Sequence, residues 1–114
     1  MLSDNIFLKV IERKIPAQIV YEDEHCLAFR DINPQAPTHV LIIPRKVIPT
    51  HDDITAADAE LLGRLHLAAV KIAKQFGLQD GYRLVINCRE RAGQTVPHLH
   101  MHLLGGREFG WPPG

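Results

Sequence analysis

Hydrophobic and polar positions follow two different periods along the chain. In residues 55–76 the apolar side chains recur every three or four positions, which is the spacing of one face of an α-helix. Thr55, with Asp58 three residues later, has the pattern of a capping box, and Gly77 stands where a C-terminal capping glycine belongs. The predicted apolar face of this long helix consists of Leu61, Leu65, Ala68, Ala69, Ile72 and Phe76.

A second, shorter helix is predicted over residues 5–12. Ser3 and Asp4 are side chains that could cap its first turn, and Pro16 follows its end. Its apolar residues are Ile6, Phe7, Val10 and Ile11.

The remaining apolar stretches are short and predict β-strands at residues 18–22, 26–32, 39–44, 82–87 and 98–104. Between the second and third strands, residues 33–37 contain two prolines and predict a rigid loop. Strands separated by short turns, with one long and one short helix, indicate an α+β domain with a five-stranded, largely antiparallel sheet. We expect residues 1–114 to form a single domain, because no linker or repeat divides them.

Composition excludes several classes of partner. Thirteen basic residues balance thirteen acidic ones, so no long-range field favours nucleic acid or an anionic membrane. Cys26 and Cys88 form no metal-binding or disulfide pattern, and we expect them to be buried apolar residues. A signal peptide and an apolar stretch of the ~20 residues needed to span a bilayer are both missing from the sequence. The sequence therefore predicts a soluble cytoplasmic protein.

Three histidines at alternate positions form the most informative segment of the chain. Because strand side chains alternate, His98, His100 and His102 would share one face of the last predicted strand. Neighbouring imidazoles would then stand about 7 Å apart along the strand. The opposite face would be apolar, and core packing alone does not select three histidines.

Three interpretations of this face are open. It is an exposed polar edge, a metal site, or a site of covalent catalysis at phosphorus. A His-x-His pair on a strand can place two imidazoles on one zinc ion, but the segment has no neighbouring carboxylate, and Cys88 stands alone. An imidazole nitrogen is also a good nucleophile at neutral pH. The spacing by itself does not choose between the three.

The triad, together with other segments, resembles the histidine-triad (HIT) superfamily, and the resemblance covers nearly the whole chain from about Ile6. The closing Trp111–Gly114 segment resembles the branch that acts as purine nucleoside phosphoramidases, also called histidine triad nucleotide-binding proteins. The other matching segments are residues 26–39, 41–44, 81–87, 93–94 and 105–107.

The resemblance implies the HIT-like fold and a mechanism in which His100 attacks the α-phosphorus to give a nucleotidyl-histidine. His102 would hydrogen-bond the phosphate or the departing group. His98 would lie behind the nucleophile together with His39. The alternative for His39 is an ordinary surface histidine at the start of a strand. The mechanism implies no metal and no other cofactor.

The resemblance also implies a nucleotide site. Thr95 and Asn87 would donate hydrogen bonds to the phosphate. Asp31 would accept hydrogen bonds from the ribose hydroxyls, the alternative being a simple turn residue. The purine would lie between apolar side chains that plain core packing would explain equally well: Ile6, Phe7, Ile15, Phe29 and Ile32.

Three positions depart from the family pattern. Asn33 replaces a common serine, which puts its ribose contact in doubt, and Thr95 replaces another serine while keeping the hydroxyl. Pro97 stands where the phosphoramidases usually have tyrosine. Basic side chains in residues 89–91 lie either near the mouth of the site or, as we favour, in a solvated loop.

The activity implied is hydrolysis of a purine nucleoside 5′-phosphoramidate, or a related adenylate, to a nucleoside monophosphate. The resemblance further implies a homodimer whose Trp111 tail crosses the interface and borders the partner's site. Two alternatives stay open: hydrolysis of dinucleoside polyphosphates, and a nucleotide- or partner-binding module with incidental hydrolysis.

Overall fold

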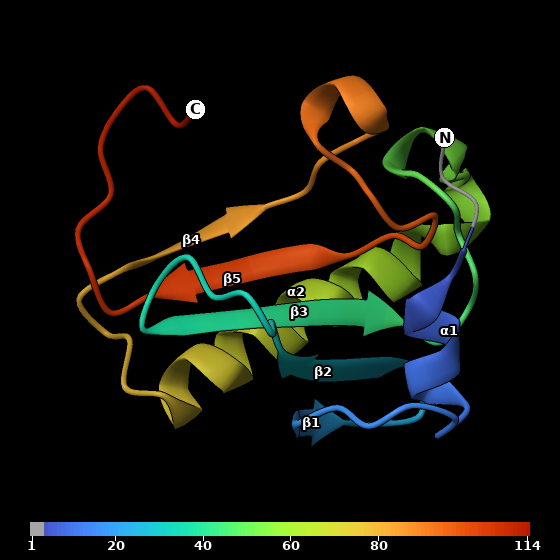
Figure 1. Ribbon diagram of the computed structural model, residues 1–114, viewed down its shortest axis with the longest axis horizontal. Helices are drawn as coiled ribbons and strands as arrows, with labels where there is room; N and C mark the ends of the chain where they lie inside the picture. The colour runs from blue at the N-terminus through green and yellow to red at the C-terminus, as the bar shows by residue number, and fades with distance from the viewer. Residues whose placement is uncertain (1–3) are drawn as a thin grey trace.

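The computed structural model describes residues 4–114 and confirms the predicted α+β architecture of five antiparallel strands, one long helix and one short helix (Figure 1). Three single-turn 3₁₀ helices lie in the connections, at His51–Asp53, Ala56–Asp58 and Glu90–Ala92. No helix in residues 4–114 has both the length and the apolarity to cross a membrane. The main elements are α1 (Ile6–Ile11), β1 (Ile19–Glu22), β2 (Cys26–Arg30), β3 (Thr38–Pro44), α2 (Ala59–Gln75), β4 (Tyr82–Val85) and β5 (Met101–Gly105).

The strands form one sheet in the order β1-β2-β3-β5-β4, and every neighbouring pair is antiparallel. All residues of the central strand β3 are buried. Its register with β5 places His39 opposite Leu104 and Leu41 opposite His102. Two histidines far apart in sequence are thereby carried on adjacent strands.

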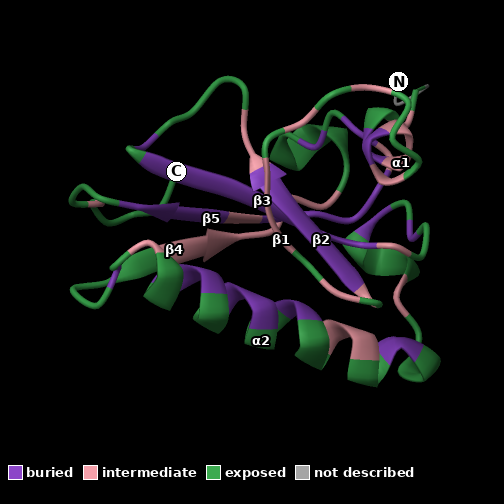
Figure 2. Ribbon diagram, turned by 90° about the horizontal axis from the view of Figure 1, so that it is seen from below, coloured by how far each residue is buried: buried purple, intermediate pink, exposed green. Residues whose placement is uncertain are grey.

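The sheet separates two apolar clusters, because strand side chains alternate between its faces. Helix α2 covers one face with its buried side turned toward the strands, and α1 lies on the other (Figure 2). Cys26 is fully buried in the α2-side cluster, as predicted, while Cys88 is only partly buried. The α1-side cluster consists of Phe7, Val10, Leu27, Phe29, Leu41, Ile43 and Val96.

Both predicted capping patterns form, but the Thr55–Asp58 capping box lies at the 3₁₀ helix Ala56–Asp58, which leads directly into α2. The backbone N–H and the hydroxyl of Thr55 both donate to one carboxylate oxygen of Asp58, at 3.0 and 3.4 Å. After α2, Gly77 adopts φ +68°, and the Leu78 N–H donates to the Ala73 carbonyl at 2.9 Å. This is the left-handed C-terminal cap that glycine favours.

The short helix is capped by a different residue from the two that were predicted, Ser3 and Asp4. Asn5 caps α1, because its Oδ1 accepts a hydrogen bond from the Leu8 N–H at 3.0 Å. Asp4 instead forms an exposed ion pair with Lys9, and Ser3 lies outside the described residues. Asparagine and aspartate are about equally good N-caps, so sequence alone did not separate the two neighbours.

The start of the last strand was also predicted incorrectly. Strand β5 begins at Met101, whereas the pattern predicted a start at His98. The Leu99 N–H donates to the Ile48 carbonyl at 2.6 Å, and the His98 N–H to Val96 at 2.8 Å, so neither joins the sheet ladder. Pro97 has no N–H to donate. The alternation nevertheless persists, since Leu99 and Met101 both belong to the α2-side cluster.

Two glycines of the α2 region should respond in opposite directions to the same substitution. Gly77→Ala should lower the free energy of unfolding by about 1 kcal/mol, because an alanine at positive φ is strained. Gly63 lies within α2, and a methyl group added there would meet open space, so Gly63→Ala should raise stability by roughly 0.5–1 kcal/mol. Urea unfolding of both variants measures the two changes in the free energy of unfolding. Equal effects would contradict the assigned cap.

Candidate active site

Four histidines form a continuous group on the α1 side of the sheet. The ring centroid of His102 lies 5.1 Å from that of His100 and 5.2 Å from that of His39. The ring of Phe7 on α1 stands edge-on to His100 at 4.9 Å. His39, His98 and His100 are buried, and His102 is half-buried. The resemblance grouped His39 with His98 behind the nucleophile, and the structure places the His39 ring against His102, while the orienting role of both stays a prediction.

The backbone determines the tautomer of His100. Its Nδ1 lies 2.7 Å from the His98 carbonyl oxygen, and a carbonyl only accepts hydrogen bonds. Nδ1 therefore carries the proton, and Nε2 of the neutral ring keeps its lone pair. That lone pair is what a nucleophile needs, so the ring of His100 is chemically able to act as one.

Both ring nitrogens of His98 are occupied by other groups. Its Nε2 donates to the Pro44 carbonyl at 2.8 Å, and its Nδ1 accepts from the side-chain amide of Asn5 at 3.0 Å. The ring is fully buried. A histidine held at both nitrogens has no lone pair to offer a substrate, which fits a supporting position.

His39 and His102 form a directed hydrogen-bonded chain. The backbone N–H of Gln35 donates to His39 Nδ1 at 3.0 Å, so the proton of His39 must lie on Nε2. That Nε2–H donates to His102 Nδ1 at 2.9 Å, with Asp31 Oδ2 3.4 Å from the same nitrogen. His102 therefore carries its own proton on Nε2, where it is a hydrogen-bond donor.

Burial keeps all four rings neutral. Desolvation lowers the pKa of His98 and of His100, and backbone hydrogen bonds only partly oppose it. Desolvation also lowers the pKa of His39 against the opposing effect of the Asp31 carboxylate. The pKa of His102 falls to about 4, first through burial and then through the neighbouring His100 and His39. Neutral imidazole is the nucleophilic form.

A metal ion fits poorly at the one cluster that approaches a metal site within residues 4–114. Ligand atoms of Asp31, His39 and His102 all lie within 4.8 Å of one another. A metal on His39 Nε2 would displace its proton, and the Gln35 N–H already blocks Nδ1 from taking it up. The ring would have to become an imidazolate or lose a backbone hydrogen bond. These bonds favour the prediction that the site uses no metal.

An apolar cavity of about 310 Å³ lies beside the histidines, between α1 and the sheet. This volume is in the range of small-molecule sites. All five predicted wall residues line it, together with Asp31 and Thr95, and the edge-on contact of Phe7 links it to His100. The sequence prediction missed Arg30 and the apolar lining residues that patterning does not distinguish from core: Val10, Pro16, Ala17, Leu41 and Val96.

Asp31 has the hydrogen bond of a turn residue and also lies at the cavity, so its contact with ribose stays a prediction. Its Oδ1 accepts a hydrogen bond from the Asn33 N–H at 2.8 Å, as a turn residue does. Its Oδ2 faces His39, and the side chain also lines the cavity. Asn33 itself is exposed and does not line the cavity.

A buried glutamine holds the loop before the triad. Gln94 donates from Nε2 to the carbonyls of Pro49 and Val96, at 2.7 and 2.9 Å, and its Oε1 accepts from the Arg89 N–H at 2.7 Å. Thr95 is exposed at the cavity, next to this anchor. Asn87 is half-buried and does not line the cavity, so the structure leaves its phosphate contact a prediction.

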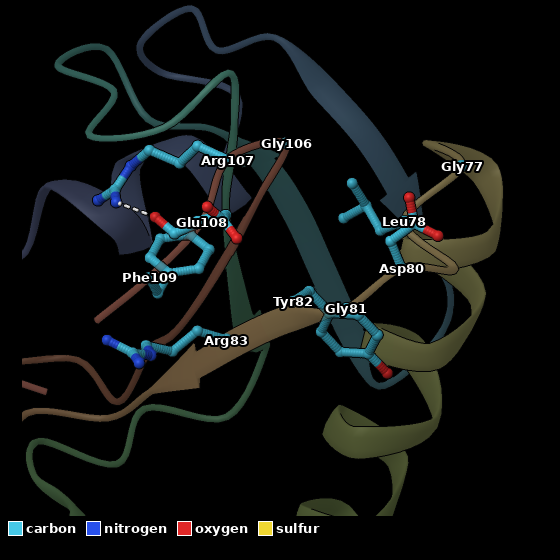
Figure 3. A pocket seen from close by; sticks show the side chains of 10 residues that line it. All are labelled: Gly77, Leu78, Asp80, Gly81, Tyr82, Arg83, Gly106, Arg107, Glu108 and Phe109. Atoms are coloured by element: carbon cyan, nitrogen blue, oxygen red, sulfur yellow. Dashed lines mark hydrogen bonds between the residues drawn. The ribbon is translucent and has the colours of Figure 1, made fainter. Parts of the chain in front are cut away.

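A larger cavity of about 680 Å³ lies at the Gly105 end of β5 and contains none of the predicted site residues (Figure 3). Phe109 stands between two guanidinium groups there, with Arg107 at 4.2 Å and Arg83 at 5.1 Å from its ring centroid. Arg83 also donates to the Gly110 carbonyl at 2.7 Å. These contacts anchor the base of the C-terminal tail, beyond which Trp111 is 84% exposed. The structure thus separates Trp111 from the other predicted nucleotide-binding residues of its own chain.

Comparison with known proteins identifies the family of the chain and agrees with the fold. The HIT domain family model matches residues 12–109, and the chain belongs to that family. It is 54% identical to the purine nucleoside phosphoramidase of Escherichia coli K12, over 96% of this chain and 93% of that protein. It is also 57% identical, over the full length of both chains, to an uncharacterized HIT-like protein of Synechocystis.

Solved structures show the same fold. A HIT family hydrolase from Legionella pneumophila superposes with a TM-score of 0.95 at 52% identity, over 97% of this chain and all of that one. A histidine triad nucleotide-binding protein from Candida albicans has a TM-score of 0.82 at 30% identity, over 97% of this chain and 85% of that one.

Acidification should destabilise the fold through His102. Unfolded histidines bind protons near pH 6.5, whereas folded His102 stays neutral down to about pH 4. Between these values the unfolded state binds more protons, so the free energy of unfolding falls as the pH drops through this window. At 1.36 kcal/mol per pKa unit, His102 accounts for up to about 3 kcal/mol of this fall in the free energy of unfolding.

Denaturant unfolding of the His102→Gln variant at pH 7 and pH 4.5 measures this contribution. The variant should lose less stability on acidification than the parent. His66→Gln, on the exposed side of α2, is the matched control and should behave like the parent. An identical pH dependence in the His102 variant and the parent would show that this ring is not the sensitive group.

Proposed function

We propose that the protein is a hydrolase that cleaves purine nucleoside 5′-phosphoramidates, or related adenylates, through a nucleotidyl-histidine on His100. One observation carries the proposal: the hydrogen bond from His100 Nδ1 to the His98 carbonyl, which directs the Nε2 lone pair away from the backbone. The identity to the E. coli purine nucleoside phosphoramidase supports this choice of substrate class.

The reaction then takes two displacements. His100 Nε2 forms a bond to the α-phosphorus while the bond from phosphorus to the leaving nitrogen or oxygen breaks, and the departing group takes up a proton. Water next attacks the same phosphorus, breaks its bond to Nε2 and releases a nucleoside monophosphate. Dividing one difficult displacement into two easier ones is the advantage of a covalent intermediate. The Nε2–H of His102 donates a hydrogen bond to the phosphate or to the departing group.

The neighbouring cavity supplies the nucleotide site in this proposal. The purine lies against the apolar wall that includes Phe7 and Phe29, and Asp31 accepts hydrogen bonds from the ribose. Thr95 at the same cavity, and Asn87, donate to phosphate oxygens. Donors aimed at phosphate oxygens stabilise the charge of the transition state without rearrangement of the site.

Replacing the nucleophile tests the proposal most directly. His100→Ala should lower turnover of an adenosine phosphoramidate by up to about 10⁶-fold, the scale of nucleophile removal in other enzymes, while AMP still binds. Rapid-quench labelling of the parent should place the nucleotidyl group on His100. The exposed His66→Ala variant should retain parental turnover. Label on His98 or His102 would disprove the assignment, and nucleotide binding without turnover by the parent would favour a binding module.

We also propose that the protein is a homodimer and that the Trp111 tail of one chain borders the site of its partner. Strand β4 is an edge of the sheet, and its Tyr82 lies 38% exposed beside the exposed Val70 of α2. The anchored base of the tail holds Trp111 away from its own domain. A large aromatic side chain in this position is expected to pack on another surface.

Deleting residues 111–114 tests the placement of the tail. The truncated protein should rank phosphoramidates with different leaving amines in a changed order of kcat/KM. Its AMP affinity should stay within about 0.5 kcal/mol, as for changes away from key contacts. Sedimentation reports the oligomeric state of both forms. An unchanged ranking would make the tail a passive end, and a large loss of AMP affinity would place it in the nucleotide pocket.

A further inference from the structure

Asn5 forms the link between the N-terminal helix and the histidine group. The residue is half-buried, and both polar atoms of its side chain are used. Its Oδ1 accepts from the Leu8 N–H at 3.0 Å, and its Nδ2 donates to His98 Nδ1 at 3.0 Å. Because a backbone N–H only donates, the orientation of the amide is defined by its partners.

This orientation determines the state of His98. A donor facing Nδ1 requires a lone pair on that nitrogen, so the proton of the neutral ring lies on Nε2. That proton is donated to the Pro44 carbonyl at 2.8 Å. Protonating Nδ1 would bring two donors face to face. Rotating the amide to relieve the conflict would remove the cap of α1.

The His98 backbone in turn holds the nucleophile. Its carbonyl accepts the Nδ1–H of His100 at 2.7 Å, and this peptide lies outside the β5 ladder. The sheet therefore does not hold this carbonyl. The Leu99 N–H of the same peptide is held by the Ile48 carbonyl at 2.6 Å, and the two bonds of the His98 ring hold the residue that carries the carbonyl. Helix α1 also contributes Phe7, which contacts both His98 and His100.

We propose that Asn5 is a positioning residue for His100: its amide keeps His98 as the neutral Nε2–H tautomer and thereby, together with the Leu99–Ile48 bond of the same peptide, keeps the His98 carbonyl in place for the nucleophile. The kinetic consequence rests on the proposed function, whereas the consequence for His98 does not. His100 is the titratable neighbour whose charge acts on His98, and the other groups bonded to the ring are uncharged.

Two substitutions separate this role from helix capping, because serine and aspartate cap helices about as well as asparagine. Asn5→Ser keeps a capping oxygen but removes the amide that reaches His98. Asn5→Asp keeps the cap and replaces the donor by a carboxylate oxygen, which favours a doubly protonated His98. Both variants should unfold at parental denaturant concentrations if the cap is preserved.

Nitrogen-15 NMR of histidine-labelled protein, without substrate, tests the effect on His98. The parent should show the neutral Nε2–H tautomer at pH 7. Asn5→Asp should shift the His98 titration to higher pH, and Asn5→Ser should leave Nδ1 without its hydrogen-bond shift. An unchanged His98 tautomer and titration in Asn5→Asp would overturn the proposal and leave Asn5 as a cap alone.

Kinetics with an adenosine phosphoramidate give the second measurement. In Asn5→Asp, the carboxylate bonds Nδ1 and leaves the Pro44 bond intact only while His98 is doubly protonated. The kcat of this variant should therefore fall toward that of Asn5→Ser as the pH rises through the new His98 pKa, with KM nearly unchanged. Asn5→Ser, which lacks the amide that reaches His98, should lower kcat at every pH. A parental pH profile of kcat in both variants would overturn the positioning role. Failure of the parent to turn over any phosphoramidate would refute the proposed function and leave the NMR result standing.

Discussion

The hydrogen bonds between main-chain groups and imidazole rings are the constraint on which this site depends. His39, His98 and His100 each bond a peptide N–H or carbonyl. Peptide groups do not titrate near neutral pH and cannot exchange donor for acceptor, so they impose one tautomer on each ring. The loop around Gln35 and the end of β3 at Pro44 must therefore be placed accurately. The two prolines of residues 33–37 and the fully buried β3 provide that accuracy.

Burial of the rings has an energetic cost that these bonds offset. A polar group moved out of water without a partner is destabilising, and a charged one more so. The site avoids the second cost by keeping its imidazoles neutral, since desolvation lowers the pKa of each. Neutrality and nucleophilicity require the same protonation state. The apolar surroundings that stabilise the fold therefore also maintain the neutral form of His100 that the proposed reaction requires.

Local patterns in the sequence predicted much of the fold. The helical period of α2, the Thr55–Asp58 cap and the positive φ of Gly77 depend on neighbouring residues, and all were predicted correctly. The cavity walls were predicted through the family resemblance. The start of β5 was not predicted, because it depends on the hydrogen bond of Leu99 to the distant Ile48. The contact of His39 with His102 was not predicted either, because it depends on the strand order that joins β3 to β5. Asn5 was missed because its second bond spans 93 positions of the chain.

The division of the apolar core by the sheet has a consequence for engineering. The cluster under α2 and the cluster under α1 share no residue, and β2, β3 and β5 lie between them. Substitutions at well-separated sites with no shared partners usually add in their effects on stability. Residues of α2 and of α1 lie on opposite faces of the sheet and meet this condition, whereas neighbouring strand residues such as Leu27 and Ala28 belong to different clusters and do not. Substitutions on α2 can therefore be used to raise thermal tolerance separately from substitutions on α1 that aim to alter substrate scope.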